Sequence, residues 1–312
     1  AYAASPVCSP TRASIMSGKY PATMRTTDWF GAPQPGDMAR LPAEQFPLLT
    51  APHQPYLALE EVTVAEALQQ AGYKTFLAGK WHLGADEKYW PEHQGFEINK
   101  GGYFKGHPNL DKKAGYDGYF SPYGNPRLED GPRGEYLPMR MAAETNTFIE
   151  ANRDKPFFAY VPLYSVHTPL QASEALIAKY KAKRERLGLQ DQFAPEGKRK
   201  VRTVQSHPVY AAMVEAMDQA IGIVRNKLAE LQLDNNTLVV FFSDNGGLST
   251  SEGSPTSNLP LRAGKGWMYE GGIRSPLIIR WPVTITPGAV NHTPVISNDF
   301  YPTFLQAAGL PL

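Results

Sequence analysis

The sequence has 312 residues, of which 42% are hydrophobic, and its 31 basic side chains nearly balance its 30 acidic ones. A chain of this length can bury one large core or two smaller ones. The formal net charge of +1 gives no reason to expect nucleic acid or an anionic membrane as the main partner. No apolar run approaches the roughly 20 residues of a membrane-spanning helix, and the single cysteine excludes an internal disulfide.

Helical patterns alternate with short apolar runs along the chain, which predicts a mostly parallel sheet with helices on both faces. Helices are expected over residues 12–18, 64–71, 138–152, 208–231 and 299–308, and strands over residues 73–78, 156–163, 237–243 and 276–281. Thr63 and Glu66 have the spacing of a capping box. The run TLVVFFS is the clearest central strand, because it is apolar throughout, as buried parallel strands are. The sequence therefore predicts an α/β fold.

Three long stretches, residues 20–59, 82–136 and 244–275, show no regular pattern and are rich in Gly, Pro, Tyr and His. Loops of this length are usually functional or disordered, and their aromatic content favours ordered loops that form a site. Their aromatic side chains could stack on sugar rings, but packing the loops down is the favoured interpretation for Trp90, Tyr103, Tyr116, Tyr119 and Tyr123. The basic residues 179–202 are expected to form a solvated helix face and a loop.

Cys8 lies just ahead of a predicted helix, where backbone N–H groups and the helix dipole favour an anion. Arg12 lies one turn further on and can reach the same anion with its two-pronged guanidinium group. This arrangement suits a nucleophile that attacks a tetrahedral oxyanion ester. A structural cysteine near the start of a helix is the alternative interpretation.

The run CSPTRAS that begins at Cys8, continuing to Gly18, resembles the signature of type I sulfatases, C-x-P-x-R-A-S-x-x-x-G. In that family a maturation enzyme oxidises the cysteine to formylglycine, whose aldehyde hydrates, and one of the two hydroxyls attacks sulfur. The run GKWHLG at residues 79–84 resembles the second sulfatase signature without a substitution. The resemblance implies that Lys80 binds sulfate and that His82 is a base.

Three later segments continue the resemblance in the order of the family. The segment SVHTP holds His167, which by resemblance contacts the ester oxygen of the leaving group. The segment SDNGG follows the clearest strand, and the resemblance implies that Asp244, Asn245 and the modified Cys8 bind calcium, a hard cation that prefers oxygen ligands. Lys265 would bind sulfate and assist protonation of the leaving oxygen. In isolation, the same segments would also suit a loop histidine and an ordinary turn.

Two further charged residues belong to the segment K-G-x-x-x-E-G-G-x-R-x-P, which this chain matches over residues 265–276. Glu270 and Arg274 are expected to be structural, as an ion pair or a turn scaffold at the entry to a strand.

The resemblance covers the chain from Tyr2 to about Leu310 and implies an alkaline-phosphatase-like fold, with one catalytic domain over residues 1–312. Two parts of that fold have no counterpart in this sequence: a first strand that ends in paired aspartates, and a smaller C-terminal subdomain. The chain is therefore expected to be an internal fragment that binds calcium weakly and has little activity alone.

The expected function is hydrolysis of sulfate esters, with a sulfated glycan as substrate class, formylglycine and calcium as cofactors, and the maturation enzyme as a partner. The resemblance also implies a periplasmic or secreted location. Two alternatives remain: a phosphodiester or phosphonate monoester hydrolase of the same superfamily, and a non-catalytic carbohydrate-binding relic. The complete GKWHLG segment favours sulfate, and the occupation of every matched catalytic position argues against a relic.

Overall fold

The computed structural model describes residues 1–41 and 48–312. Its α-helices are α1 (Cys8–Ser17), α2 (Pro21–Met24), α3 (Val64–Gln70), α4 (Leu137–Ala151), α5 (Glu174–Arg186), α6 (Pro208–Glu230), α7 (Glu270–Ile273) and α8 (Phe300–Ala307). Its strands are β1 (Lys74–Ala78), β2 (Ile98–Lys100), β3 (Leu110–Asp111), β4 (Tyr116–Asp117), β5 (Phe157–Tyr160), β6 (Phe193–Glu196), β7 (Arg199–Arg202), β8 (Val239–Phe242) and β9 (Leu277–Arg280). Within the described ranges, no helix has both the length and the apolar character needed to cross a bilayer.

The predicted helices and strands are confirmed, with small shifts at their ends. The capping box at the start of α3 is present, because Thr63 Oγ1 accepts a hydrogen bond from the Glu66 N–H at 3.1 Å and the Glu66 carboxylate accepts one from the Thr63 N–H at 2.7 Å. The prediction for the first helix was wrong at its start. Helix α1 begins at Cys8 and not at Arg12, so the cysteine is the first residue of the helix and does not lie in a loop ahead of it.

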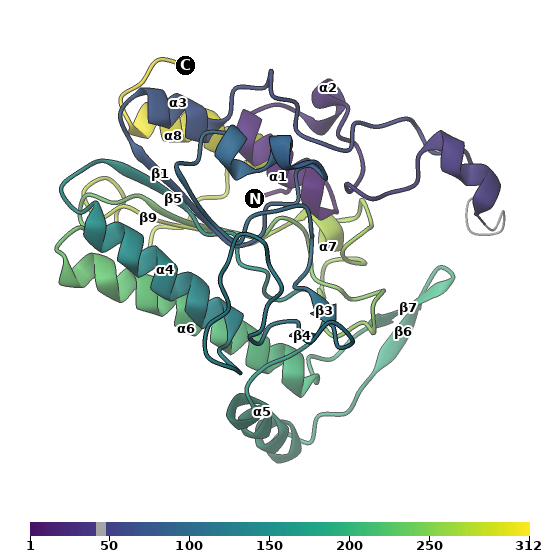
Figure 1. Ribbon diagram of the computed structural model, residues 1–312. Helices are drawn as coiled ribbons and strands as arrows, with labels where there is room; N and C mark the ends of the chain where they lie inside the picture. The colour runs from purple at the N-terminus through teal and green to yellow at the C-terminus, as the bar shows by residue number, and fades with distance from the viewer. Residues whose placement is uncertain (42–47) are drawn as a thin grey trace.

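The sheet consists of two sets of strands that lie between the same two layers of helices (Figure 1). The first set is parallel, in the order β2-β1-β5, and in the second set β8 pairs with β9 in antiparallel register. Helices α4 and α6 cover one face, and α1, α3 and α8 cover the other. Each face has its own cluster of buried apolar side chains, one centred on α1, α3 and α8 and the other on α4 and α6. The predicted α/β architecture is therefore confirmed, with β9 as an antiparallel edge.

An apolar channel separates the two sets of strands. In the described part of the chain, β5 pairs only with β1 and β8 pairs only with β9, so one edge of each strand is unpaired. Both strands line a cavity of about 1150 Å³, together with the Met217, Ile221 and Val224 side chains of α6. Strand β1 is buried after its first residue, whereas all residues of β5 and β8 are only half-buried. The channel lies within the sheet, where the resemblance implied that a strand is missing.

Candidate functional site

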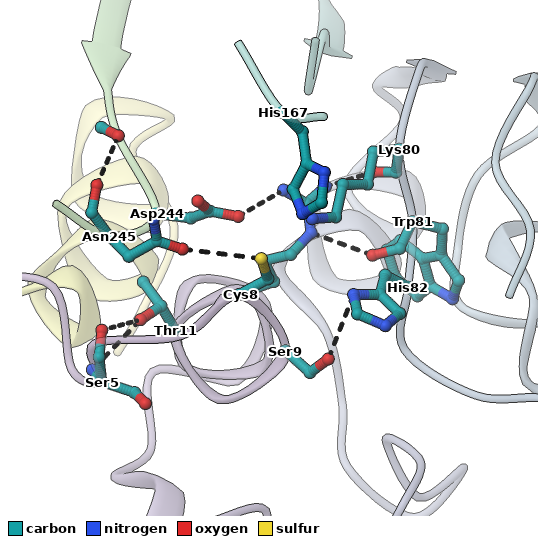
Figure 2. Close-up of polar contacts among 12 residues, drawn as sticks. Ser5, Cys8, Ser9, Thr11, Lys80, Trp81, His82, His167, Asp244 and Asn245 are labelled. Atoms are coloured by element: carbon teal, nitrogen blue, oxygen red, sulfur yellow. Dashed lines mark hydrogen bonds and ion pairs between the residues drawn. The ribbon is translucent and has the colours of Figure 1, made fainter. Parts of the chain in front are cut away.

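The cysteine is held at the start of a fully buried helix. Every residue of α1 is buried, and the turn before it is tied down because Thr11 Oγ1 accepts from the Ser5 N–H at 3.1 Å and donates to the Ser5 carbonyl at 3.0 Å. The Cys8 thiol donates to Asn245 Oδ1 at 3.5 Å (Figure 2). The reactive atom is therefore fixed between the helix and the loop that follows β8.

The Arg12 guanidinium group contacts three protein oxygens, and its expected grip on a substrate anion stays a prediction. Its Nε donates to the Trp81 carbonyl at 2.9 Å, one terminal nitrogen donates to the Lys80 carbonyl, and the other contacts Asp244 Oδ2 at 3.1 Å. Arg12 is buried, with its side chain only 5% exposed. Arg12 thus connects α1 to the loops after β1 and β8, and it sets the positions of the neighbouring charges.

The chain curls after β1, at Gly79 and again at His82. Gly79 has a φ of +128°, and a Cβ there would lie 2.2 Å from the Pro162 carbonyl oxygen, so only glycine fits. His82 has a φ of +62°, an unusual conformation for a non-glycine residue that is found preferentially at functional sites. Trp81, between the two, is fully buried in the core. Lys80 and His82 therefore face the site together (Figure 2).

The buried cations of the site set the protonation of their neighbours. Burial lowers the pKa of His82 well below its ordinary value, and the positive charges of Lys80 and Arg12 lower it further. His82 is therefore neutral near pH 7, with Nδ1 at 3.3 Å from Ser9 Oγ. Burial opposes ionisation of Asp244, but Lys80 and then Arg12 outweigh it and lower the pKa of this carboxyl. Asp244 is thus an ionised carboxylate.

His167 and Lys265 form a second pair at the site. Lys265 Nζ lies 3.0 Å from His167 Nε2, and His167 Nδ1 lies 2.9 Å from the Thr168 carbonyl oxygen. Because a carbonyl oxygen can only accept, these hydrogen bonds assign the proton to Nδ1 and leave Nε2 to accept from the Lys265 ammonium. Burial, followed by the charges of Lys265 and Lys80, lowers the pKa of His167 to about 4. The proton available from this pair is therefore on Lys265.

Asp244 and Asn245 provide the type of oxygen ligand that calcium prefers, but two residues are too few to complete its coordination. A carboxylate and an amide oxygen are suitable ligands, yet calcium takes about six to eight oxygens. Among residues 1–41 and 48–312, no group of three or more His, Cys, Asp or Glu side chains is arranged to hold a metal. Asp244 Oδ2 accepts a hydrogen bond from Arg12, and Asn245 Oδ1 accepts one from Cys8. The described residues alone do not form a complete calcium site.

The structure brings the predicted site residues together. One cavity is lined by Cys8, Arg12, Lys80, His167, Asp244, Asn245 and Lys265. His82 joins the group through Ser9, which follows the cysteine in α1. Figure 2 shows the cysteine between the Asp-Asn pair on one side and Lys80 and His82 on the other. Segments that are far apart in the sequence thus meet at one end of the sheet.

Two residues of the site were not found from the sequence. A Cβ on Gly106 would lie 2.6 Å from His82 Cε1, so the loop after β2 packs directly on the imidazole ring. Glu252 accepts a hydrogen bond from Thr168 Oγ1 at 2.7 Å, and its other oxygen lies 3.6 Å from Lys265 Nζ. Both residues lie in long irregular loops, where residue type and spacing carry no signal of a contact.

The aromatic loop residues mostly pack the loops, as predicted. The side chains of Trp90, Tyr103, Tyr119 and Tyr123 are buried, and Tyr116 is half-buried. The expected ion pair is also present, because Arg274 Nη1 lies 3.2 Å from Glu270 Oε2. Glu270 accepts a further hydrogen bond from the Tyr2 hydroxyl at 2.9 Å, which joins this turn to the N-terminal residues.

Comparisons with known proteins show the family and the fold of the chain. The Sulfatase family model matches residues 1–310. A sulfatase of Formosa agariphila is 32% identical, over 98% of this chain and 59% of its own length. Human arylsulfatase A is 31% identical, over 98% of this chain and 55% of its own length. The crystal structure of Ps i-CgsB in complex with k-i-k-neocarrahexaose is 27% identical, with a TM-score of 0.75 over 100% of this chain and 63% of that one.

The chain therefore spans somewhat more than half the length of the relatives it matches. Its α/β architecture agrees with that of a solved structure across the whole chain. Because the family match runs over nearly all of its residues, this chain belongs to the sulfatase family.

Proposed function

We propose that the chain carries the catalytic site of an enzyme that hydrolyses sulfate esters, with Cys8, converted to formylglycine, at the reacting position. The observation that carries the proposal is the convergence of Cys8, Lys80 and His167 on one cavity beside the ionised Asp244. We further propose that residues 1–312 are one catalytic domain. The activity itself belongs to the whole protein, since the relatives are longer than this chain.

Formylglycine at position 8 would supply an aldehyde hydrate, one hydroxyl of which is the nucleophile for sulfur. The chain's own residues support the attack in two ways. The N-terminal end of α1 favours negative charge beside position 8. Lys80 is only 3% exposed, so little water screens the attraction between its ammonium group and sulfate oxygens.

The leaving group departs on the side of His167 and Lys265. As the S–O bond breaks, its electron pair stays on the leaving oxygen, and Lys265 Nζ gives that oxygen a proton and becomes a neutral amine. His167 cannot supply this proton in the observed state, because its Nε2 accepts a hydrogen bond from Lys265. His82 is neutral, and its Nδ1 lies 3.3 Å from Ser9 Oγ. We propose that it accepts a proton from the group at the neighbouring position 8.

A calcium ion, when bound, would neutralise charge on sulfate oxygens as a Lewis acid. Asp244 and Asn245 would hold it, and we propose that its remaining ligands come from outside the described residues. Whether or not the ion is bound, Arg12 keeps the Asp244 carboxylate in place at the end of β8.

The proposed substrate is a sulfated glycan. The support comes from Ps i-CgsB, which is described as a complex with k-i-k-neocarrahexaose and matches this whole chain. A periplasmic or secreted location and a formylglycine-generating maturation enzyme as partner complete the proposal, and both rest on the family resemblance.

The decisive test is Cys8→Ala in the whole protein. We expect release of sulfate from sulfated oligosaccharides to fall by roughly 10⁴-fold or more, because the nucleophile is lost. Ser17→Ala, at the other end of α1, is the matched control and should leave turnover unchanged. In the unchanged protein, mass analysis of the Cys8 peptide should show a loss of about 18 Da, which marks replacement of the thiol by an aldehyde. Full turnover by Cys8→Ala would end the proposal.

The two alternatives are separated by further measurements on the same protein. A phosphodiester hydrolase would turn over an aryl phosphodiester faster than the matching aryl sulfate, and the sulfatase proposal predicts the reverse. A carbohydrate-binding relic would bind sulfated oligosaccharides, but neither sulfate nor phosphate would be released.

A further inference from the structure

Glu252 lies beside the leaving-group side of the site, and neither the motifs nor the proposed mechanism uses it. Its backbone has a φ of +49°, in the left-handed region that non-glycine residues rarely adopt. One carboxylate oxygen accepts from Thr168 Oγ1 at 2.7 Å, and the other lies 3.6 Å from Lys265 Nζ. The carboxylate therefore joins the loop that carries His167 to the loop that carries Lys265.

The contacts around Lys265 account for two of its three N–H donors. One donor is directed to His167 Nε2 at 3.0 Å and a second faces Glu252 Oε1 at 3.6 Å. An ammonium group has three donors, so one remains for a substrate atom. His167 in turn is fixed by the Thr168 carbonyl at 2.9 Å, so the four residues form a closed ring of contacts.

The charges in this ring favour an ionised Glu252. Burial alone would raise the pKa of its carboxyl, but the charge of Lys265 and the hydrogen bond from Thr168 outweigh burial and lower it. The other titratable groups that act on the ring are His167, which faces both Glu252 and Lys265, and Lys80, whose charge acts on His167. Glu252 is thus a fixed negative charge beside the proposed proton donor.

We propose that Glu252 is the positioning residue for Lys265: it holds the ammonium group against His167 so that the remaining N–H faces the leaving oxygen. This inference rests on the proposed sulfatase function and deepens it. Glu252 does not contact the reacting atoms. It acts through Lys265, which gives its proton to the leaving oxygen as the S–O bond electrons move there.

The test compares Glu252→Gln with the unchanged whole protein on two kinds of sulfate ester. An alkyl or sugar sulfate needs protonation of its leaving oxygen, whereas 4-nitrophenyl sulfate has a stable leaving group. We expect kcat to fall roughly tenfold or more on the sugar sulfate, a part of the usual contribution of a general acid. On 4-nitrophenyl sulfate we expect kcat to fall by less than about threefold, with KM unchanged on both substrates.

Glu196→Gln is the matched control, because this carboxylate also pairs with a cation, Arg262 at 2.9 Å, without contact to Lys265. The control should behave like the unchanged protein. In a Lys265→Ala background, Glu252→Gln should cause no further loss, because the residue that it positions is gone. A full additional loss, or a rise in KM with kcat unchanged, would show that Glu252 contacts the substrate and would overturn the inference.

A second measurement does not require turnover. Lys265 can be acylated by a small amine-reactive reagent and followed by peptide mass spectrometry. The reaction should be several-fold faster in Glu252→Gln than in the unchanged protein, and unchanged in Glu196→Gln. If the unchanged protein hydrolyses no sulfate ester, the proposed function fails. Equal acylation rates of Lys265 in the unchanged protein, Glu252→Gln and Glu196→Gln would separately refute the role of Glu252.

Discussion

The site has two halves that are built differently. The anion-holding half consists of Cys8, Arg12, Lys80, His82 and Asp244, which lie on α1 or shortly after β1 and β8. Arg12, Lys80 and His82 are at most 7% exposed, and the Asp244 side chain is 23% exposed. The leaving-group half consists of His167, Glu252 and Lys265, which lie on long loops, with the Lys265 side chain 13% and that of Glu252 40% exposed.

This difference separates the residues proposed to bind the sulfate group from the residues proposed to contact the leaving group of the substrate. The anion-holding half is fixed by secondary structure, and its cations Arg12 and Lys80 lie in a dry environment where charges act strongly. The leaving-group half is held mainly by contacts among its own side chains, so loop sequence can change it without disturbing the sheet. Substitutions in the first half should therefore affect every substrate, and those in the second half should depend on the leaving group.

The largest expected effect is that of Lys80→Ala. It should lower kcat/KM by roughly 10³-fold on sugar sulfates and on 4-nitrophenyl sulfate alike, because it removes a buried charge from the sulfate oxygens. Lys265→Ala should instead spare the nitrophenyl ester. Lys74→Ala, which removes an exposed lysine paired with Glu97, is the control. Comparable leaving-group dependence for Lys80→Ala and Lys265→Ala would contradict the division into halves.

Gly106→Ala should cost roughly 10- to 100-fold in kcat, because the new methyl group would displace the His82 ring from its position beside Ser9. The thermal unfolding temperature should change little. Gly36→Ala is the control, since a Cβ there meets nothing within 4 Å. An active Gly106→Ala enzyme would show that the position of the His82 ring does not limit turnover.

The pH profile should show that both histidines stay neutral in mild acid. Burial, together with Lys80 and Arg12, lowers the pKa of His82, and the pKa of His167 is lowered to about 4. A base with a lowered pKa accepts protons until the pH falls through that lowered value. We therefore expect kcat/KM to stay constant through the ordinary histidine pKa of 6.5 and to fall only at lower pH. A decline centred on the ordinary histidine pKa near 6.5 would refute neutral, buried histidines.

The smallest expected effect is that of calcium on residues 1–312. Asp244 and Asn245 are a partial ligand set, so we expect a dissociation constant near 1 mM, which gives a stabilisation of about 0.4 kcal/mol at 1 mM calcium. Calorimetric titration and thermal unfolding with and without calcium measure this. Tight, submicromolar binding that is lost in Asp244→Asn would show that these residues already form a complete site.

The sequence predicted the anion-holding half better than the leaving-group half for a physical reason. Lys80 and Asp244 follow apolar strands directly, so the position of each strand places its side chain. The start of α1 at Cys8 was missed because its N-cap, Val7, offers no capping side chain that would mark it. The antiparallel direction of β9 was also not predicted, since apolar patterning does not encode strand direction.

Contacts between distant loops could not be predicted at all. Glu252 and Thr168 come into contact because two long loops fold over the same end of the sheet. No local sequence pattern predicts a contact of this kind. The protein contacts of Arg12 were missed for a similar reason. Its partners are two backbone carbonyls and a carboxylate from other segments. Because every residue has a backbone carbonyl, residue types do not indicate which carbonyls a side chain will contact.

The apolar channel between β5 and β8 also determines how this chain should behave in solution. Each unpaired edge presents a row of backbone N–H and C=O groups, and such edges recruit extended peptides, including those of other molecules. A peptide that entered the channel would satisfy both edges at once and bury its own apolar side chains between the helix layers. We therefore expect residues 1–312 to aggregate at high concentration, and a segment that fills the channel to act as an internal chaperone for the sheet.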